Sequence, residues 1–567
     1  MKLRELSGEL WQHVKKDFFH NTGSFLFIML YITVFQIIFG TENSIVGVSF
    51  TTLMLASMSR DMTGAPVKHL CIQSVVMLWM GAAACAVCIL PPLAGLPVNL
   101  LTMFFILYAF TYEYASQLYF PYILSYLFYI FISPVSVDRL PMRLLALFTG
   151  AVSIIVYQLV KGRHKAKETV QDVLVELLAQ ARTSAEYLLT GEGAPSDLTQ
   201  ARATLCKLSR TIYERRKKVL YVSDGAFAML DAGRGLESLI LKLLEHPKAK
   251  CQDEKMFLTA VVNWLDGAGT YIRGERQTVP PMEKIDAPDA WSREILDMIS
   301  YIQEHLLQGH DKEKGRVYRP TALSLSVRLK AALDVSPVRV VYALRVSVLL
   351  SLATAFVLWQ GLPHGKWLLF TLASCSMPYA DDVKGKAGKR VAATLIGVLT
   401  AFVLFSLIPS SAIRTIFIML FGYVSFYFSG YTGSFSCATV GAVGGAVMTC
   451  FGWEAVGSMA LVRIGYILVG ALLALVVNCL IVPYTASTAT KQLFKKYAGI
   501  IRLLSKVCQT ENPDPQLYYS LVIQSHLMEE KLLDNAAGTK WDREMDALLI
   551  GGRRAIRNAH LKRAEAS

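Results

Sequence analysis

The chain has 567 residues, of which 53% are hydrophobic and only 18% are charged, and its mean hydropathy is +0.41. This composition excludes an ordinary soluble protein, because the apolar excess needs a lipid environment, and the length excludes a single small domain. The formal charge of +14 calls for an anionic partner. We expect the membrane surface and not nucleic acid, because lysine and arginine gather at the ends of apolar runs and do not alternate with aromatic residues in one patch.

Residues 1–22 precede the first apolar run and predict a cytoplasmic amphipathic helix lying on the membrane. Basic residues such as Lys15 and Lys16 are mixed with Trp11 and Phe18, and no small-residue cleavage site follows a short apolar core. This pattern is typical of an interfacial helix and differs from that of a cleaved signal peptide.

Two hydrophobic blocks follow, at residues 23–160 and 336–484. Each holds six apolar runs, which lie at 24–40, 44–59, 70–90, 98–115, 118–132 and 143–160 and at 342–361, 365–381, 390–408, 412–428, 432–451 and 459–483. Most approach the roughly 20 residues that cross a hydrocarbon core about 30 Å thick. We therefore predict an all-α integral membrane protein with two transmembrane bundles of about six helices each.

Polar, helix-patterned segments follow each block, at residues 161–335 and 485–567. Apolar residues recur at helical spacing in both, for example at Val173, Leu177 and Ala181 in the first. The sequence GEGAPSD at 191–197 ends one predicted helix, and Ser196 or Asp197 is suited to cap the next. We predict a helical domain after the first bundle and a helical tail after the second.

Basic residues in the short loops predict the orientation of the chain. Loops rich in lysine and arginine lie at 161–167, 381–390 and 491–496, whereas 91–97, 409–412 and 451–458 contain neither residue. Because basic loops stay in the cytosol, both termini and segment 161–335 are expected to be cytoplasmic, in a multi-pass inner or plasma membrane protein.

The two blocks share short motifs at a nearly constant offset, which indicates an internal duplication. Asp61-x-x-Gly64-x-x-x-Lys68-His69 matches Asp382-x-x-Gly385-x-x-x-Lys389-Arg390 at an offset of 321 residues, and Arg143 with Gly150 matches Arg463 with Gly470 at an offset of 320. An even number of spans per copy gives both copies the same orientation, related by an axis along the membrane normal. A site between the halves is then expected.

The second copy resembles the fusaric acid resistance protein-like family of aromatic acid exporters. The matching residues are Trp367-x-x-x-Thr371, Pro378, Arg390-x-x-Ala393-Thr394-x-x-Gly397 and Arg463-x-x-Tyr466-x-x-x-Gly470. Ala393 stands where the family has glycine, which weakens the motif while keeping a small side chain. The layout of bundle, helical domain, bundle and tail is similar over nearly the whole chain, and the first copy carries the motif only in degenerate form.

This resemblance implies proton-driven efflux of aromatic or other hydrophobic carboxylic acids. Plant aluminium-activated malate transporters, which conduct organic anions, look like distant relatives. Two alternatives stay open: a passive organic-anion channel, and a non-transporting envelope or scaffold protein whose helical domain recruits a partner.

Five residues of the second copy are candidates for binding the substrate: Arg463, Arg390, Lys389, Trp367 and Thr371. A buried arginine is costly without an acidic partner, and its planar fork suits a carboxylate. Trp367 is suited to stack on an aromatic ring of the substrate, but a tryptophan at this depth is also a common interfacial anchor. The competing interpretation for Arg463 is a structural or snorkelling role. For the basic pair at 389–390 it is a role in setting the topology.

Asp381 and Asp382 are candidates for proton coupling, and Glu113 is a third. Adjacent carboxylates repel each other, which favours proton uptake by one of them, although a solvated loop paired with Lys384 or Lys386 explains the same pattern. The repeat-equivalent positions in the first copy are Arg143, Lys68, His69 and Asp61.

The sequence contains no phosphate-binding loop and no catalytic motif, so we expect no enzymatic activity, cofactor or metal. The expected partners are a small organic acid and membrane lipid, and no nucleic acid. A second copy of the chain and, in a Gram-negative cell, a periplasmic adaptor are further candidates.

Overall fold

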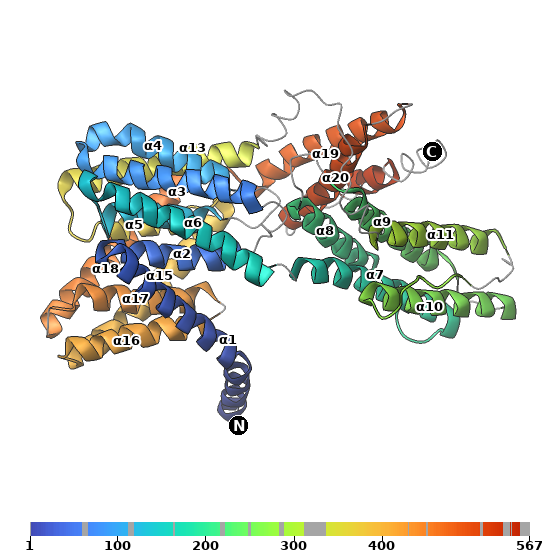
Figure 1. Cartoon of the computed structure of the whole chain (residues 1–567), viewed down its shortest axis with the longest axis horizontal. Helices are drawn as coiled ribbons and strands as arrows, with labels where there is room; N and C mark the ends of the chain where they lie inside the picture. The colour runs from blue at the N-terminus through green and yellow to red at the C-terminus, as the bar shows by residue number, and fades with distance from the viewer. Residues whose placement is uncertain are drawn as a thin grey trace. The chain divides into compact units, whose positions relative to one another are not determined.

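The computed structural model describes residues 2–58, 66–111, 118–162, 165–215, 222–247, 251–282, 289–310, 336–428, 430–449, 452–510, 514–536, 545 and 547–555. Within these ranges every regular element is a helix, and no β-strand occurs (Figure 1). The helices form two compact units. Unit 1 comprises Met1–Ser59, Lys68–Val156 and Ser336–Ala486, and unit 2 comprises Arg60–Val67, Tyr157–Val335 and Ser487–Ser567.

Unit 1 contains the two hydrophobic blocks. The first supplies α1 (Lys2–Phe39), α2 (Ser44–Ser57), α3 (Pro66–Ile89), α4 (Pro92–Phe110), α5 (Tyr119–Phe131) and most of α6 (Leu140–Gly162). The second supplies α13 (Pro337–Gln360), α14 (Lys366–Cys375), α15 (Ala380–Leu407), α16 (Ser411–Val424), α17 (Tyr431–Ala446) and α18 (Trp453–Leu475). Their order follows the predicted apolar runs.

Seven of the described helices are long and apolar enough to cross a membrane, so this is a multi-pass membrane protein. They are Asn21–Phe39, Pro66–Ile89, Pro92–Phe110, Val137–Val160, Pro337–Gln360, Ala380–Leu407 and Trp453–Ile481. The other five runs form shorter helices, α2, α5, α14, α16 and α17, of 10 to 16 residues. Such helices fall short of the roughly 20 residues that a single straight span requires.

The chain unwinds between α14 and α15, inside the apolar run at 365–381, where Pro378 predicts a break. The α14 helix ends at Cys375 and α15 begins at Ala380, with Pro378 between them. Proline lacks a backbone N–H and restricts the residue before it, which ends the helix here. Arg345 donates hydrogen bonds to the carbonyl oxygens of Met377 (2.6 Å) and Pro378 (3.3 Å), so unwound backbone is satisfied inside the protein.

The first helix of each block packs against the fourth helix of the other block. The α13 helix lies along α4, where Arg339 donates to the Tyr108 carbonyl at 2.6 Å, and α1 contacts α16 and the turn after it. There the Thr22 and Tyr423 hydroxyls are 2.8 Å apart. The helices of the two blocks therefore pack against each other within one unit.

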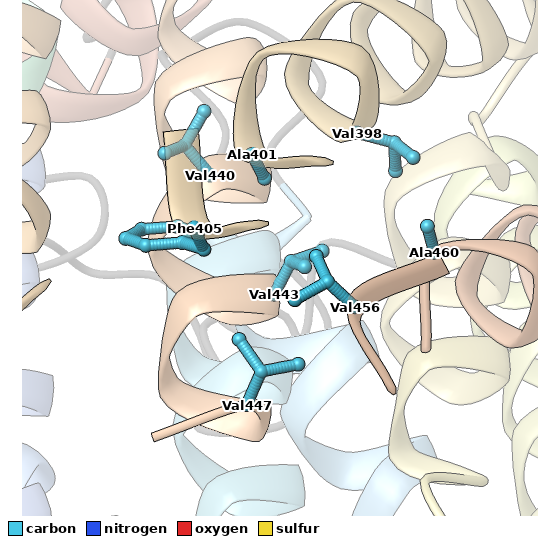
Figure 2. Close-up of a cluster of buried hydrophobic side chains, with 8 residues drawn as sticks. All are labelled: Val398, Ala401, Phe405, Val440, Val443, Val447, Val456 and Ala460. Carbon is cyan, nitrogen blue, oxygen red and sulfur yellow. The ribbon is translucent and has the colours of Figure 1, made fainter. Parts of the chain in front are cut away.

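Three helices of the second block, α15, α17 and α18, share a buried hydrophobic cluster (Figure 2). It consists of Val398, Ala401, Phe405, Val440, Val443, Val447, Val456 and Ala460. Burial of this side-chain surface, at about 25 cal/mol per Å², holds the three helices together. The same helices carry the polar residues described below, so the cluster fixes their relative positions.

Unit 2 combines the middle of the chain with its C-terminal part. Its helices are α7 (Lys165–Thr190), α8 (Leu198–Arg215), α9 (Asp224–Glu245), α10 (Gln252–Arg273), α11 (Ala290–His310), α19 (Ala486–Cys508) and α20 (Pro515–Ala536). The predicted stripe of Val173, Leu177 and Ala181 is buried, and the Asp197 carboxylate accepts the Thr199 N–H at 2.8 Å, which confirms the predicted cap.

The tail packs on the middle segment within unit 2, although the sequence treats the two as separate pieces. The α20 helix lies against α8, with the His526 Nδ1 and Ser209 Oγ atoms 2.8 Å apart. Gln516 donates to the Val222 carbonyl at 3.1 Å and accepts its N–H at 2.9 Å. These contacts join residues about three hundred positions apart into one core.

Candidate functional site

The buried arginines of unit 1 fall into two groups. Six are buried within the described residues: Arg143, Arg339, Arg345, Arg390, Arg414 and Arg463. Four of them make at least two hydrogen bonds each to carbonyl or side-chain oxygens. Such bonds offset much of the cost of burying a guanidinium group. The remaining two, Arg390 and Arg463, lack them.

Arg390 projects from α15 and is only 5% exposed. Its guanidinium carbon lies 4.6 Å from the centre of the Phe435 ring, and its Nε atom has no hydrogen-bond partner among the described residues. One turn earlier on α15, the Lys386 ammonium lies 3.8 Å from the centre of the Tyr431 ring. Both cations therefore rest on aromatic faces of α17, an arrangement that stabilises a charge without neutralising it.

Arg463 projects from α18 and is also 5% exposed. Its guanidinium carbon lies 4.8 Å from the centre of the Trp367 ring on α14. A single long contact of 3.5 Å joins Nη2 to the Thr439 hydroxyl, while Nε and Nη1 have no partner in the described part of the chain. Several donors of this side chain are consequently available to a ligand.

The two guanidinium groups are neighbours. Phe435 and Thr439, which they contact, are four residues apart on α17 and so lie on one face, about 6 Å from each other. The charge of Arg390 also acts on Arg463. No ion pair joins either group to a carboxylate among the described residues, so two like charges share an apolar interior. An anion between them would relieve both the repulsion and the desolvation cost.

Two glycines allow the helices around these arginines to approach closely. A side chain at Gly397 of α15 would lie 2.5 Å from the Ser436 carbonyl oxygen of α17. A side chain at Gly470 of α18 would lie 3.0 Å from Thr371 and 3.1 Å from the Leu368 carbonyl oxygen of α14. The glycines of both predicted motifs therefore position the helices that carry the arginines.

The structure places the other predicted substrate-binding residues differently. Trp367 is buried, and its indole contacts both Arg463 and the His364 ring, whose centroid is 4.7 Å away. Thr371 is buried too, but its hydroxyl donates to the Trp367 carbonyl at 2.8 Å. Lys389 is exposed, on a different side of α15 from Arg390. Of these three residues, only Trp367 contacts one of the two buried arginines, Arg463.

The residues predicted for proton coupling lie away from the buried arginines. Asp381 and Asp382 are exposed in the first turn of α15, about 13 Å along the helix from Arg390. The Asp381 carboxylate accepts the Ala486 N–H at 2.7 Å. Glu113 lies outside the described residues.

The first block does not reproduce this arrangement. Arg143, which the sequence motifs predict to correspond to Arg463, donates to the Asn43 side chain at 2.6 Å, to the Glu42 carbonyl at 2.9 Å and to Ser133. Lys68 is exposed and His69 partly exposed, while Asp61 lies outside the described residues. Arg143 therefore donates several hydrogen bonds to protein oxygens, whereas Arg463 has a single long contact.

Four residues of this site were not singled out from the sequence: Lys386, Tyr431, Phe435 and Thr439. Lys386 precedes Arg390 by one helical turn, and the other three recur at intervals of four on α17. These spacings place each set on one helix face. The sequence does not show which face of α17 meets α15, and it therefore does not predict that these residues lie together.

The fold and site define a multi-pass, all-helical membrane protein with a buried cationic cluster. Residues 352–477 match the fusaric acid resistance protein-like family, so the chain carries a domain of that family in its second block, as the sequence motifs predicted. This stretch includes both arginines and every helix that surrounds them. No curated protein and no solved structure matches the chain.

Proposed function

We propose that the protein is a transporter that exports aromatic or other hydrophobic carboxylic acids and is driven by the proton gradient. The observation that carries this proposal is the pair of buried guanidinium groups without a carboxylate partner, Arg390 and Arg463. A bound carboxylate supplies the missing charge and accepts from the free donors of Arg463. The family domain at residues 352–477 is consistent with a transporter.

The surroundings of the arginines favour an acid with an apolar body. Trp367, Tyr431 and Phe435 make the walls beside the cations aromatic. A small, strongly hydrated anion gains little from such walls, whereas an organic acid buries its apolar part against them.

Transport by alternating access is supported by the arrangement of the two blocks. Both have six helices in the same order, and each contributes its first helix to a contact with the fourth helix of the other. We propose that they are parallel repeats, as the shared motifs suggest, and that the unwound segment between α14 and α15 takes part in the movement. Asp381 and Asp382 are the proposed proton-linked carboxylates near that segment.

The test is transport of radiolabelled aromatic acids by the purified full-length protein in proteoliposomes. Wild-type protein should accumulate one or more acids of a broad panel under an imposed pH gradient. Arg390→Gln and Arg463→Gln should lower the initial rate by about tenfold or more, since each removes a charge-assisted contact worth about 1.5–3 kcal/mol. Lys384→Gln, which removes an exposed charge from the same helix, should leave the rate unchanged.

Three outcomes would contradict the proposal. Absence of transport across the panel would exclude it, and full activity of both arginine variants would remove its structural basis. Unitary currents that reverse at the anion equilibrium potential would identify a channel instead.

A further inference from the structure

Unit 2 contains a cavity of about 890 Å³ that the proposed transport site does not use. The helices α8, α9, α11 and α20 and the helical segment 547–555 all contribute to its wall, and α9 and α11 lie side by side (Figure 1). Cavities that bind small organic molecules have volumes of about 300–1,000 Å³. The volume of this cavity is therefore that of a small-molecule site.

Much of the wall is apolar. Leu205, Leu241, Met298 and Ile550 line the cavity, together with the side chain of Tyr301. These residues come from α8, α9, α11 and the segment 547–555, so apolar surface faces the space from several directions. Burial of apolar ligand surface against them favours binding. The cavity thus selects a ligand with an apolar body.

A neutral histidine offers a hydrogen-bond acceptor to the cavity. His526 lines it, is only 8% exposed, and has its Nδ1 atom 2.8 Å from the Ser209 hydroxyl. That hydroxyl donates to the Leu205 carbonyl at 3.1 Å, so it accepts from Nδ1 and leaves Nε2 as an acceptor. Burial and the charges of Arg234 and Arg553 lower the pKa of His526 to about 3, so the ring is neutral near pH 7. An N–H group of a ligand is its natural partner.

Two ion pairs lie close together at one end of the cavity. Arg202 of α8 contacts Glu237 of α9 at 3.0 Å, and Arg553 contacts Glu529 of α20. Cys206, one helical turn after Arg202, donates to a backbone carbonyl of α20 at 3.5 Å, and this carbonyl lies about one turn before Glu529. The two pairs are therefore neighbours across the contact between α8 and α20.

Arg554 gives this end an excess of positive charge. It lines the cavity next to Arg553, is exposed, and forms no ion pair with a described residue. The remaining cation at this end, Arg234, is paired with Asp231 at 3.1 Å. Because the other guanidinium groups are neutralised, Arg554 is the one that lacks an anion. A carboxylate of a ligand can supply it.

The opposite end of the cavity has an excess of negative charge. Lys242 of α9 is paired there with Glu294 of α11. Glu245 and Asp297 line the same end, are exposed, and form no ion pair with a described residue. Glu245 lies about 12 Å along α9 from Glu237, which marks the arginine end. The uncompensated charges of the cavity are therefore separated, with a cation at one end and two carboxylates at the other.

We propose that this cavity binds an elongated zwitterion with an apolar middle, whose anionic end meets Arg554 and whose cationic end meets Glu245 and Asp297. A single α-amino acid is too short, because both of its charged groups are attached to one carbon atom. An extended peptide spans at most about 3.3–3.6 Å per residue, so an apolar peptide of about four residues with free termini has the required length. Its backbone N–H groups match the acceptor of His526. This site does not depend on the proposed function.

The test is calorimetric titration of the purified full-length protein in detergent with an alanine–leucine tetrapeptide. The peptide with free termini should bind, and its N-acetylated and C-amidated forms should each bind about three- to tenfold more weakly, because one charge contact is lost. Arg554→Gln should weaken binding of the free peptide and remove the effect of amidation. The double variant Glu245→Gln and Asp297→Asn should remove the effect of acetylation. Arg293→Gln, at an exposed position of α11 outside the cavity wall, should behave like wild type.

The charge variants remove exposed groups without ion pairs, so their thermal midpoints should equal that of wild type. Ser238→Trp, which fills the cavity from α9, should abolish binding of every form of the peptide. The proposal is overturned if no alanine–leucine peptide of about three to five residues binds to the wild-type protein. Equal affinities of the free and blocked forms would overturn it too, as would an effect of amidation that persists in Arg554→Gln.

Discussion

The buried arginines of unit 1 differ in how many hydrogen-bond partners they have. Arg414 donates to the carbonyl oxygens of Ile408 (2.7 Å), Phe405 (2.9 Å) and Val447, and so ties α16 to the ends of α15 and α17. Arg463 has one contact of 3.5 Å. The first side chain contributes to stability, while the charge of the second is buried without compensating bonds, and we propose that a ligand supplies them.

This difference predicts opposite effects of the same substitution. Arg414→Gln should lower the free energy of unfolding by about 2–4 kcal/mol, because it leaves buried carbonyl groups unpaired. Arg463→Gln should leave the stability of the ligand-free protein unchanged or higher, because an uncompensated charge is removed. Thermal unfolding of the two variants in detergent measures both effects, and equal destabilisation would contradict the distinction.

Sequence alone singled out Arg390 and Arg463 but not their partners. Both lie in motifs that resemble the exporter family, and Arg463 is in addition a charge inside an apolar run. Arg345 and Arg414 are also charges inside apolar runs, and their carbonyl partners are brought to them only by the turns of the fold. Because those partners are distant or backbone atoms, the residue types do not reveal them.

At the level of the helix, small residues determine how closely α15 approaches α17. Gly397 faces the Ser436 carbonyl, whereas Gly385 of the same helix has no atom within 4 Å of its added side-chain position. The same substitution can therefore be compared at a closely packed position, Gly397, and at an open position, Gly385, of one helix.

Gly397→Ala should lower the free energy of unfolding by about 1–3 kcal/mol, because the helices must separate to admit a methyl group. Gly385→Ala should be neutral or stabilising by up to about 1 kcal/mol, since alanine favours the helix. Denaturation of both variants in detergent tests the prediction. A neutral Gly397→Ala would show that the α15–α17 contact is not close-packed.

The apolar runs predicted which segments form helices, but not all of their ends. Hydropathy averages over a window and gives one run across Pro378, and the break there was predicted from the proline itself. It also placed the start of the next span at residue 390, ten residues after the observed start of α15 at Ala380, because Asp381, Lys384 and Lys386 are charged. Tertiary contacts, such as those of Arg345, stabilise a helix boundary that composition does not show.

At the scale of the whole chain, the proposed transport direction depends on which side of the membrane holds unit 2. The basic loops predict the cytosol. Cys251 in unit 2 is exposed and offers a natural reporter, and Ser411 at the start of α16 is an exposed position in a loop predicted to be external.

A membrane-impermeant maleimide should label Cys251 in inverted vesicles and not in intact cells, as read by peptide mass spectrometry. A Ser411→Cys variant should show the opposite pattern, because the positive-inside rule puts the loop at 409–412 outside. Labelling of Cys251 from the outer surface of intact cells would contradict the predicted orientation and the role that depends on it.

The joining of distant segments in unit 2 has a consequence for biosynthesis. Ser209 and its partner His526 are separated by 317 residues, and the second hydrophobic block lies between them. At roughly 5–20 residues per second, the ribosome delivers the tail about 15–60 s after the middle segment. During that interval the surface of α8 that later receives α20 lacks this partner, so the core of unit 2 is completed only after the second hydrophobic block has been made.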